Sequence, residues 1–334
     1  MIKIGINGFG RIGRLVLRAA LERQRENFKI VSINDLGSLQ QNYHLLNFDS
    51  VHGKLNFKST IENNNLFIDE DKISFYNQRL PENIPWEENE VDIVLECTGL
   101  FTDANSAKKH LSKGVKKVLI SAPSNNAEIT VVFGVNSNLI SDRHDIISNA
   151  SCTTNCLAPV AKILNDNFGI EAGFMTTVHS FTSDQKIIDG LHKDARRGRT
   201  ASISMIPTST GAAKAVGLVL PELEGKLDGT AIRIPTPNVS MIDFTFQSKE
   251  IINKDDINKV IKKESSDKLE NILEYNDLPL VSIDYNHNSS SSIFDSTQTQ
   301  TVGDHFGRVL SWYDNEWGFS NRMIDVAKKI GDFI

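Results

Sequence analysis

Two of the three cysteines of the chain lie in the stretch SNASCTTNC (residues 148–156). An apolar run ends just before this stretch, and a helix-patterned segment follows it. Cys152 therefore falls in the first turn of the expected helix, where unpaired N–H groups and the helix dipole favour a thiolate. Ser151 or Thr153 can cap that turn. The pattern predicts a nucleophilic thiol at residue 152.

Two other interpretations of Cys152 stay open at this point. It can be a buried structural cysteine, although its Ser, Thr and Asn neighbours suit burial poorly. It can also pair with Cys156 on a metal, but no further Cys or His lies nearby to complete tetrahedral ligation, so we expect no metal site. Pro159 predicts a kinked first turn or a helix interrupted near Asn155.

A thiolate nucleophile needs a base, and His179 at the end of the strand-like run MTTVHSFT (175–182) is the candidate. The chain has eight histidines, and the sequence alone leaves open whether His179 lies in the core, on the surface or in a site. His44, His52 and His110 are expected on the surface.

Three features predict binding of anions. The segment 186–199 holds five Lys or Arg against two Asp, which suits an anionic substrate, a subunit contact or a solvated loop. The run Thr208-Ser-Thr-Gly211 opens a helix and offers hydroxyls with free N–H groups, a plausible phosphate cradle. Arg233 stands in an apolar strand-like run with no acid adjacent, so a phosphate-bearing substrate is one partner for it.

The sequence GFGRIG (8–13) follows one expected strand and opens one expected helix, as the dinucleotide-binding fingerprint requires. Asp35, 22 residues past Gly13, ends the second strand, where a carboxylate accepts the hydroxyls of an adenine ribose and repels a 2′-phosphate. No Arg or Lys follows before Lys54, so NAD is favoured over NADP. The alternative is that Asp35 only caps the next helix. Cys97, at the end of a later strand, is expected to be an inert core thiol.

Elements that position these residues alternate between strands and helices in the first half of the chain. The expected strands are 2–7, 28–34, 91–96, 117–121, 130–133 and 145–148, the expected helices are 11–23, 40–48 and 103–113, and 66–68 with 73–76 form an inserted hairpin. This order predicts a mostly parallel sheet covered by helices. After residue 150 the pattern changes: residues 239–247 alternate with one slip near Ile242, which predicts antiparallel strands. Helices at about 210–220, 254–274 and 316–333 complete an α+β domain, and the run 288–292 is expected to be a turn.

Size and composition set the limits of these predictions. A chain of 334 residues with 40% apolar and 23% charged residues is expected to fold as two domains. A net charge of −6 argues against a dedicated nucleic-acid binder, and three cysteines fit a reducing compartment. No apolar run reaches about 18 residues, and strand-like sequence begins at Ile2, so we expect no membrane span, no signal peptide and a cytoplasmic location.

Taken together, these residues closely resemble the glyceraldehyde-3-phosphate dehydrogenase family, phosphorylating type. The matching runs are INGFGRIGR (6–14), DSVHG (49–53), ECTGLFT (96–102), SNASCTTNCLAP (148–159), TTVHS (176–180), STGAAKAVG (209–217), RIPTPNVS (233–240) and SWYDNEWGFSNRM (311–323). They occur in order over nearly the whole chain, and SNASCTTNCLAP is highly specific to the family.

The resemblance implies an α/β Rossmann domain over residues 1–150, to which a C-terminal helix at 316–334 returns, and an α+β catalytic domain with an antiparallel sheet over 151–315. It implies Cys152 as nucleophile, His179 as base, Thr182 and Arg233 for the phosphate of the substrate, and Asn315 for the nicotinamide carboxamide. The attacking inorganic phosphate would be bound by Ser151, Thr153, Thr210 and Gly211 with Arg197 nearby, and the rest of NAD by Gly8, Gly10, Arg11, Ile12, Asp35, Thr98 and Ser121.

The implied reaction oxidises D-glyceraldehyde 3-phosphate through a cysteine thioester, which inorganic phosphate converts to 1,3-bisphosphoglycerate, in glycolysis or gluconeogenesis. The implied assembly is a homotetramer in which the basic segment 181–203 borders the cofactor of a neighbouring subunit. Two departures from the family concern NAD: residues 190–192 lack the proline common there, and Phe319 replaces a frequent Tyr. Alternatives are erythrose-4-phosphate dehydrogenase and a catalytically idle redox or RNA-binding relative.

Overall fold

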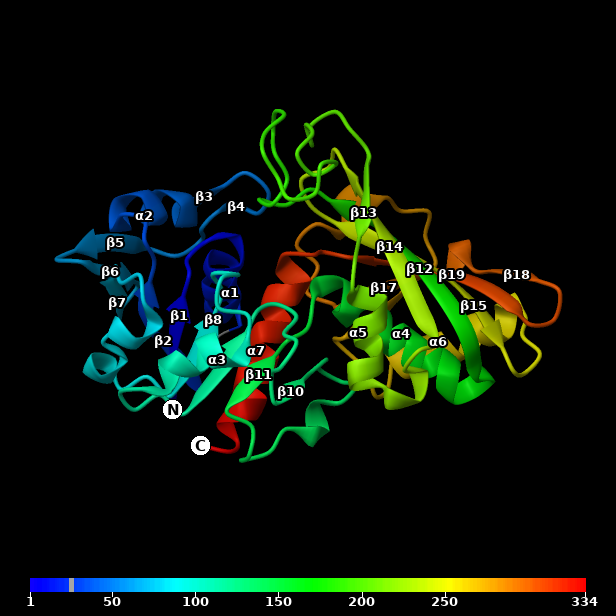
Figure 1. The fold of residues 1–334 in the computed structure, drawn as a ribbon, viewed down its shortest axis with the longest axis horizontal. Helices are drawn as coiled ribbons and strands as arrows, with labels where there is room; N and C mark the ends of the chain where they lie inside the picture. Colours follow the sequence, from blue (N-terminus) through cyan, green and yellow to red (C-terminus); the bar gives the residue numbers. More distant parts are fainter. Residues whose placement is uncertain (24–26) are drawn as a thin grey trace. The chain divides into compact units, whose positions relative to one another are not determined.

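The computed structural model describes residues 1–23 and 27–334 and divides the chain into two compact units (Figure 1). The first unit comprises Met1–Val131, Ser137–Ala150 and Ser320–Ile334, and the second comprises Val132–Asn136 and Ser151–Phe319. No helix among the described residues is long and apolar enough to cross a membrane.

The first unit is built on a nine-stranded sheet, blue to green in Figure 1, in the order β10-β11-β9-β8-β1-β2-β7-β6-β5. Its strands are β1 (Ile2–Asn7), β2 (Phe28–Asn34), β5 (Ser59–Glu62), β6 (Asn65–Ile68), β7 (Asp71–Tyr76), β8 (Ile93–Glu96), β9 (Lys117–Ile120), β10 (Ile129–Thr130) and β11 (Ile146–Ser148), and β3 (Phe48–Asp49) pairs with β4 (Gly53–Lys54). The strands from β10 to β7 pair in parallel, and β8 and β9 are buried along their whole length. This is the predicted Rossmann arrangement.

The expected hairpin exists, but it is not separate from the sheet. Strands β6 and β7 pair antiparallel with Ile68 opposite Asp71, and β7 also pairs in parallel with β2. The hairpin, with β5 beyond it, therefore extends the sheet at the edge next to β2.

The helices of the first unit are α1 (Arg11–Glu22), α2 (Leu39–Asn47), α3 (Ala104–Ala107) and most of α7 (Trp317–Gly331). The long helix expected over 103–113 is wrong, because α3 has four residues and a 3₁₀ turn over Lys108–Leu111 follows it. Asp103 caps α3 by accepting from Asn105 N and Ser106 N.

The second unit contains a mixed sheet in the order β13-β14-β12-β15-β19-β17-β16, and β18 pairs with β19. Its strands are β12 (Ile170–Ser180), β13 (Ile206–Ser209), β14 (Leu227–Ile234), β15 (Ser240–Ser248), β16 (Leu273–Asn276), β17 (Ser292–Asp295), β18 (Gln300–Val302) and β19 (Phe306–Tyr313). Two pairs, β12 with β14 and β16 with β17, are parallel, and the others are antiparallel. The predicted α+β class is confirmed.

The slip expected in β15 is wrong. Ile242, Phe244 and Phe246 are buried on one face with strict alternation, and Met241 is half-buried on the other. Val239, predicted to lie in the strand, precedes it and has the left-handed φ of 65°.

The helices of the second unit are α4 (Cys152–Phe168), α5 (Ala212–Val219) and α6 (Lys254–Ser265). The interruption expected near Asn155 is wrong, because α4 runs for 17 residues through Pro159. The helix expected over 254–274 ends at Ser265. The expected turn at 288–292 ends in a buried cluster, since Ser290 and Ser291 are buried and Ser292 begins β17.

Candidate active site

Cys152 is the first residue of α4, at the N-terminus of the helix. Ser151 caps this helix, because its Oγ accepts from Thr154 N at 3.0 Å. The N–H groups of the first turn have no carbonyl partner within the helix, so they face the region of the thiol with their partial positive charge. The cap predicted for Ser151 is confirmed.

His179 lies opposite this thiol, with its Nε2 3.5 Å from Cys152 Sγ. The imidazole is held near the end of β12, where His179 is the parallel neighbour of Arg233 in β14. Neighbouring residues of adjacent strands present their side chains on the same face. Cys152 and His179 are 27 positions apart in the sequence, and His179 and Arg233 are 54 apart. The fold brings these three residues together.

Two groups compete for His179 Nδ1. The Ser180 carbonyl oxygen lies at 2.7 Å and requires a proton on Nδ1, whereas Arg233 Nη1 lies at 2.6 Å and requires a lone pair there. A proton on Nδ1 leaves Nε2 free to accept the thiol proton, and a proton on Nε2 is donated to a thiolate. The two partners of Nδ1 therefore favour opposite neutral tautomers of His179, and the tautomer bonded to the Ser180 carbonyl is the one in which Nε2 can accept the thiol proton.

Burial disfavours both charged forms of this pair. It lowers the pKa of His179 to about 3, and the positive charge of Arg233 acts in the same direction. Burial also raises the pKa of the Cys152 thiol, while Arg233 and the hydroxyl and N–H of Thr153 oppose that rise. At neutral pH the imidazole of His179 is therefore neutral, and the charge of Arg233 favours the thiolate form of Cys152 against the effect of burial on its pKa.

The guanidinium of Arg233 has unused hydrogen-bonding capacity. Nη1 contacts His179 and the Ser180 carbonyl, but Nε is buried and has no hydrogen-bond partner among the described residues. Burial lowers the pKa of Arg233, yet a guanidinium stays charged in proteins. A buried cation with an unpaired N–H favours an anionic ligand. Thr182 has no printed contact with it; its N and Oγ1 both donate to Gln185 Oε1.

A cluster of hydroxyls joins the starts of α4 and α5. Thr154 Oγ1 donates to Ala212 O at 3.2 Å, and Thr210 Oγ1 accepts from Ala212 N, so two helix N-termini lie close together. Gly211, the exposed N-cap of α5, adds no side chain there. Polar groups therefore come from two helix starts at this place, rather than from one.

The hydroxyl of Thr153 points away from this cradle. It lies 2.9 Å from the hydroxyl of Tyr313, which also lies 2.9 Å from Thr177 Oγ1, and all three side chains are buried. The Thr153 hydroxyl also lowers the pKa of Cys152, so it is shared between Tyr313 and the thiol. The Tyr313 ring also packs edge-on against His179 at 5.9 Å. We did not predict Tyr313 from the sequence, although it lies in the run SWYDNEW.

Arg197 is anchored to β13. Its Nε donates to Thr208 Oγ1 at 2.8 Å and its Nη2 to Ser209 O at 3.1 Å, next to Thr210 in the chain. Asp184 pairs with it at 3.1 Å, so the positive excess expected here is partly neutralised.

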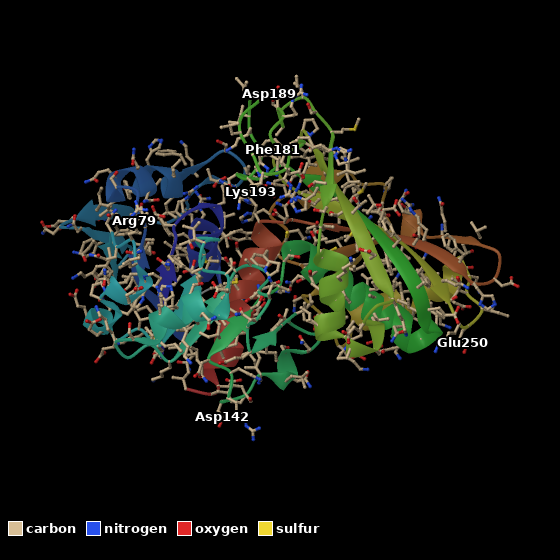
Figure 2. All side chains as sticks on the ribbon, in the orientation of Figure 1. Arg79, Asp142, Phe181, Asp189, Lys193 and Glu250 are labelled. Atoms are coloured by element: carbon tan, nitrogen blue, oxygen red, sulfur yellow. The ribbon has the colours of Figure 1, made fainter. Side chains whose placement is uncertain are left out.

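The loop that carries Arg197 extends beyond β13, and Figure 2 shows Asp189 at its outer end with Phe181 and Lys193 nearer the base. Asp189 pairs with Arg199 at 2.8 Å. Ile187, Ile188 and Leu191 are more than three-quarters exposed here, at 76%, 79% and 99%. The loop thus offers apolar side chains as well as charge.

Asn315 lies two residues beyond the end of β19 and takes no part in the Cys152–His179 contact. Its Oδ1 accepts from Ser180 Oγ at 2.8 Å and from Ser240 Oγ at 2.9 Å. Ser180 directly follows His179, so the amide and the base are held by neighbouring residues of one strand.

The glycine-rich turn of the first unit fits a dinucleotide. Gly8 has φ 90°, and a Cβ on Gly13 would lie 2.1 Å from the Gly8 carbonyl oxygen, so neither position admits a side chain. A Cβ on Gly10 would meet nothing within 4 Å, which leaves open space at the start of α1. A cavity of about 250 Å³ lies here, and Gly8, Gly10, Asp35, Leu36, Arg79 and Thr98 are among its lining residues.

Asp35 braces this turn and does not cap α2. Its two carboxylate oxygens accept from Phe9 N and Gly37 N, both at 2.7 Å, while Ser38 caps the helix. The alternative of a helix cap is therefore wrong. Asn42 Nδ2 also donates to Oδ1 at 3.2 Å, so Oδ2 is the oxygen that keeps a lone pair for a further donor, as a ribose hydroxyl would require.

Glu96 fixes the position of Thr98 from below the cavity. Its Oε1 accepts from Thr98 N, and its Oε2 accepts from Asn7 Nδ2 at 2.6 Å and lies 3.0 Å from His110 Nε2. His110 is fully buried, so its expected surface position is wrong. Trp86 Nε1 donates to the other ring nitrogen of His110, Nδ1, at 3.2 Å. The signal that could have found this network is the Glu that ends β8 in ECTG.

The other predicted cofactor residues lie around the same turn. Arg11 forms an ion pair with Asp49, whose pKa is lowered to about 2 because the His52 and Val51 N–H groups and Arg11 outweigh burial. Ile12 is half-buried in α1, and Ser121 follows β9, where its N donates to Glu96 O at 3.0 Å.

The two other cysteines are not suited to catalysis. Burial raises the pKa of Cys97 to about 12 and raises that of Cys156 further. Cys156 Sγ lies 3.4 Å from Ser292 Oγ in the core. In the described ranges, 1–23 and 27–334, no three His, Cys, Asp or Glu side chains are grouped so that they could hold a metal ion.

Comparison with known proteins gives matches over nearly the whole chain. Residues 2–104 match the family described as glyceraldehyde 3-phosphate dehydrogenase, NAD binding domain, and residues 151–315 match its C-terminal domain. A protein of Xanthobacter flavus named glyceraldehyde-3-phosphate dehydrogenase is 54% identical over 330 residues, 99% of this chain and 98% of its own. Glyceraldehyde-3-phosphate dehydrogenase 1 of Bacillus subtilis (strain 168) is 51% identical over 330 residues, 98% of each chain.

Proposed function

Because the chain belongs to the glyceraldehyde-3-phosphate dehydrogenase family, we propose that Cys152 is its nucleophile and His179 its base. The chain is an NAD-dependent oxidoreductase that oxidises glyceraldehyde 3-phosphate. Its relatives do not favour erythrose-4-phosphate dehydrogenase or an idle binding protein.

NAD would be held in the first unit by the open turn at Gly8 and Gly10, with the backbone of Arg11 and Ile12 at the start of α1. Asp35 would accept the ribose hydroxyls, Thr98 and Ser121 would line the far side, and Asn315 would bind the carboxamide. Nη1 of Arg11 is paired with Asp49, and its backbone N–H lies in the first turn of α1. When bound, NAD accepts the hydride from the substrate carbon.

Cys152 Sγ attacks the aldehyde carbon and forms a hemithioacetal. His179 Nε2 lies 3.5 Å from the sulfur and takes the proton of the hemithioacetal hydroxyl as the carbon is oxidised. This step leaves a thioester on Cys152. The N–H of Cys152 at the helix start is a donor for the oxyanion. The observation that carries this mechanism is the contact of one imidazole with both the thiol and a guanidinium.

Two anion sites would serve the two phosphates. Arg233, with its unpaired Nε, and Thr182 would bind the phosphate of the substrate. Ser151, the Thr153 N–H, Thr210 and Gly211, with Arg197 nearby, would bind the inorganic phosphate that attacks the thioester and releases 1,3-bisphosphoglycerate. The joined starts of α4 and α5 support this second site.

The thioester is tested by intact mass measurement. The full chain is mixed with NAD and glyceraldehyde 3-phosphate without inorganic phosphate, and we expect an acyl adduct that peptide mapping places on Cys152. Added phosphate should remove it, and Cys152→Ser should never form it. An adduct elsewhere, or none, would refute the mechanism. Parallel rates with NADP and with erythrose 4-phosphate test cofactor and substrate preference.

On the family resemblance we also propose a cytoplasmic homotetramer that works in glycolysis or gluconeogenesis. The exposed apolar side chains of Ile187, Ile188 and Leu191 support a subunit contact through the loop 181–203. Light scattering after size exclusion should give the mass of four chains. A mass that remains that of one chain at micromolar concentration would rule the tetramer out.

A further inference from the structure

The side-chain oxygen of Asn315 is held by two buried serines. Ser180 Oγ at the end of β12 donates to Oδ1 at 2.8 Å, and Ser240 Oγ at the start of β15 donates at 2.9 Å. The two serines are themselves joined, because Ser180 N donates to Ser240 Oγ at 3.0 Å. Ser180 is 0% and Ser240 1% exposed, so water does not replace these partners.

Counting protons fixes which end of the amide faces the serines. Each hydroxyl has one proton to donate. Apart from Asn315 Oδ1, the only acceptor printed for either hydroxyl is the other serine, at 3.4 Å. If the amide of Asn315 were turned by 180°, Nδ2 would face both hydroxyls, and at least one buried proton would have no acceptor. The orientation with Oδ1 toward the serines is therefore the stable one.

We infer that Ser180 and Ser240 are positioning residues that fix the Asn315 amide with Nδ2 toward the ligand. No hydrogen bond of Nδ2 occurs within residues 1–23 and 27–334, so its donors are available. This inference rests on the proposed role of Asn315 toward the nicotinamide ring. It adds a specificity rule: the ring substituent must offer an acceptor, such as a carbonyl oxygen, and one that offers only donors is rejected.

Ser180 is the better of the two for a test. Its carbonyl contacts His179 Nδ1 and its N–H contacts Ser240, but both belong to the backbone and remain in Ser180→Ala. The substitution removes one hydroxyl donor only. Ser180→Ala/Ser240→Ala removes both donors. Ser311→Ala is the matched control, since Ser311 is equally buried in β19 and its Oγ has no partner among the described residues.

The experiment compares two nucleotides by calorimetry on full chains stripped of bound nucleotide. ADP-ribose lacks the pyridine ring, so only NAD depends on Asn315. We expect Ser180→Ala to raise the Kd of NAD about three- to tenfold, the range for one hydrogen bond, and the double variant to raise it further. The Kd of ADP-ribose should stay unchanged, and Ser311→Ala should change neither.

Asn315→Ala separates this inference from the proposed function. It should weaken NAD binding, and adding Ser180→Ala to it should cost nothing more, because the serine acts only through Asn315. If Asn315→Ala leaves NAD affinity unchanged, the proposed role of Asn315 is wrong and the inference fails with it. If Asn315→Ala weakens NAD binding but Ser180→Ala does not, the inference alone is overturned. It is also overturned if Ser180→Ala weakens the binding of NAD and of ADP-ribose equally.

Discussion

Arg233 offers the sharpest test of the site, because it contacts the base and has an unpaired donor. Its Nη1 lies 2.6 Å from His179 Nδ1, and its buried Nε lacks a partner among the described residues. Replacement by Met keeps the aliphatic stem and removes the charge and all five donors. The variant Arg233→Met should therefore lose the binding of the substrate phosphate and the support that the cation gives to the thiolate.

The expected size follows from the hydrogen bonds lost. One charge-assisted hydrogen bond contributes about 1.5–3 kcal/mol, so KM for glyceraldehyde 3-phosphate should rise about 10- to 150-fold. Glyceraldehyde has no phosphate to lose, and its KM should change little. Because Arg233 lowers the pKa of Cys152, the pH midpoint of thiol alkylation in the variant should move upward.

The assays are initial rates with both aldehydes and alkylation rates between pH 5 and 10. Arg308→Met is the control, since Arg308 pairs with Asp243 at 2.7 Å in the same sheet and touches neither Cys152 nor His179. If Arg233→Met raised KM equally for both aldehydes, Arg233 would not be the residue that binds the substrate phosphate. If only NAD affinity changed, the assignment of Arg233 would be wrong.

Three other substitutions test the remaining groups. Cys152→Ser should abolish turnover while the Kd of NAD, measured by calorimetry, stays within about twofold; retained turnover would end the covalent mechanism. His179→Asn should slow acylation by about 10²–10⁴-fold, the range for a lost general base, and should move the midpoint of thiol alkylation to higher pH, since no imidazole supports the thiolate; an unchanged midpoint would refute the pairing. Tyr313→Phe removes the hydroxyl shared by Thr153 and Thr177 and should lower stability by about 1–3 kcal/mol, measured by urea unfolding, because two buried hydroxyls lose a partner; a loss under about 0.5 kcal/mol would show that those hydroxyls pair elsewhere.

The elements around the cofactor were predictable because their signals are local. Residues Ile2–Asn7 and Phe28–Asn34 form strands as the apolar runs indicate, and the glycine turn follows directly. The position of Cys152 was predictable for the same reason: Cys152 and its Ser151 cap lie at one helix start. In each case the physical cause acts within one turn of the residue concerned.

Partners that meet through the sheet were not predictable from spacing. Tyr313 reaches Thr153 across 160 positions, and His110 is buried against a glutamate that ends another strand. Both residues looked ordinary in the sequence, since a histidine among lysines is typical of a surface. The fate of Pro159 depended on tertiary packing too, because the buried face of α4 outweighs one lost helical hydrogen bond.

The end of β12 explains why the sheet must hold its register for the site to exist. His179 and Ser180 are consecutive, so their side chains leave opposite faces of the strand, one toward Cys152 and Arg233 and the other toward Asn315. A slip of one residue between β12 and β14 would exchange these faces, place Ser180 opposite Arg233 and move His179 away from the thiol. The long ladder with β14 from Gly173 to Ser180, together with the pairing of β15 up to Val178, opposes that slip. The position of His179 therefore depends on backbone pairing along the whole strand, and that is why a lone histidine in the sequence could not be told from a structural one.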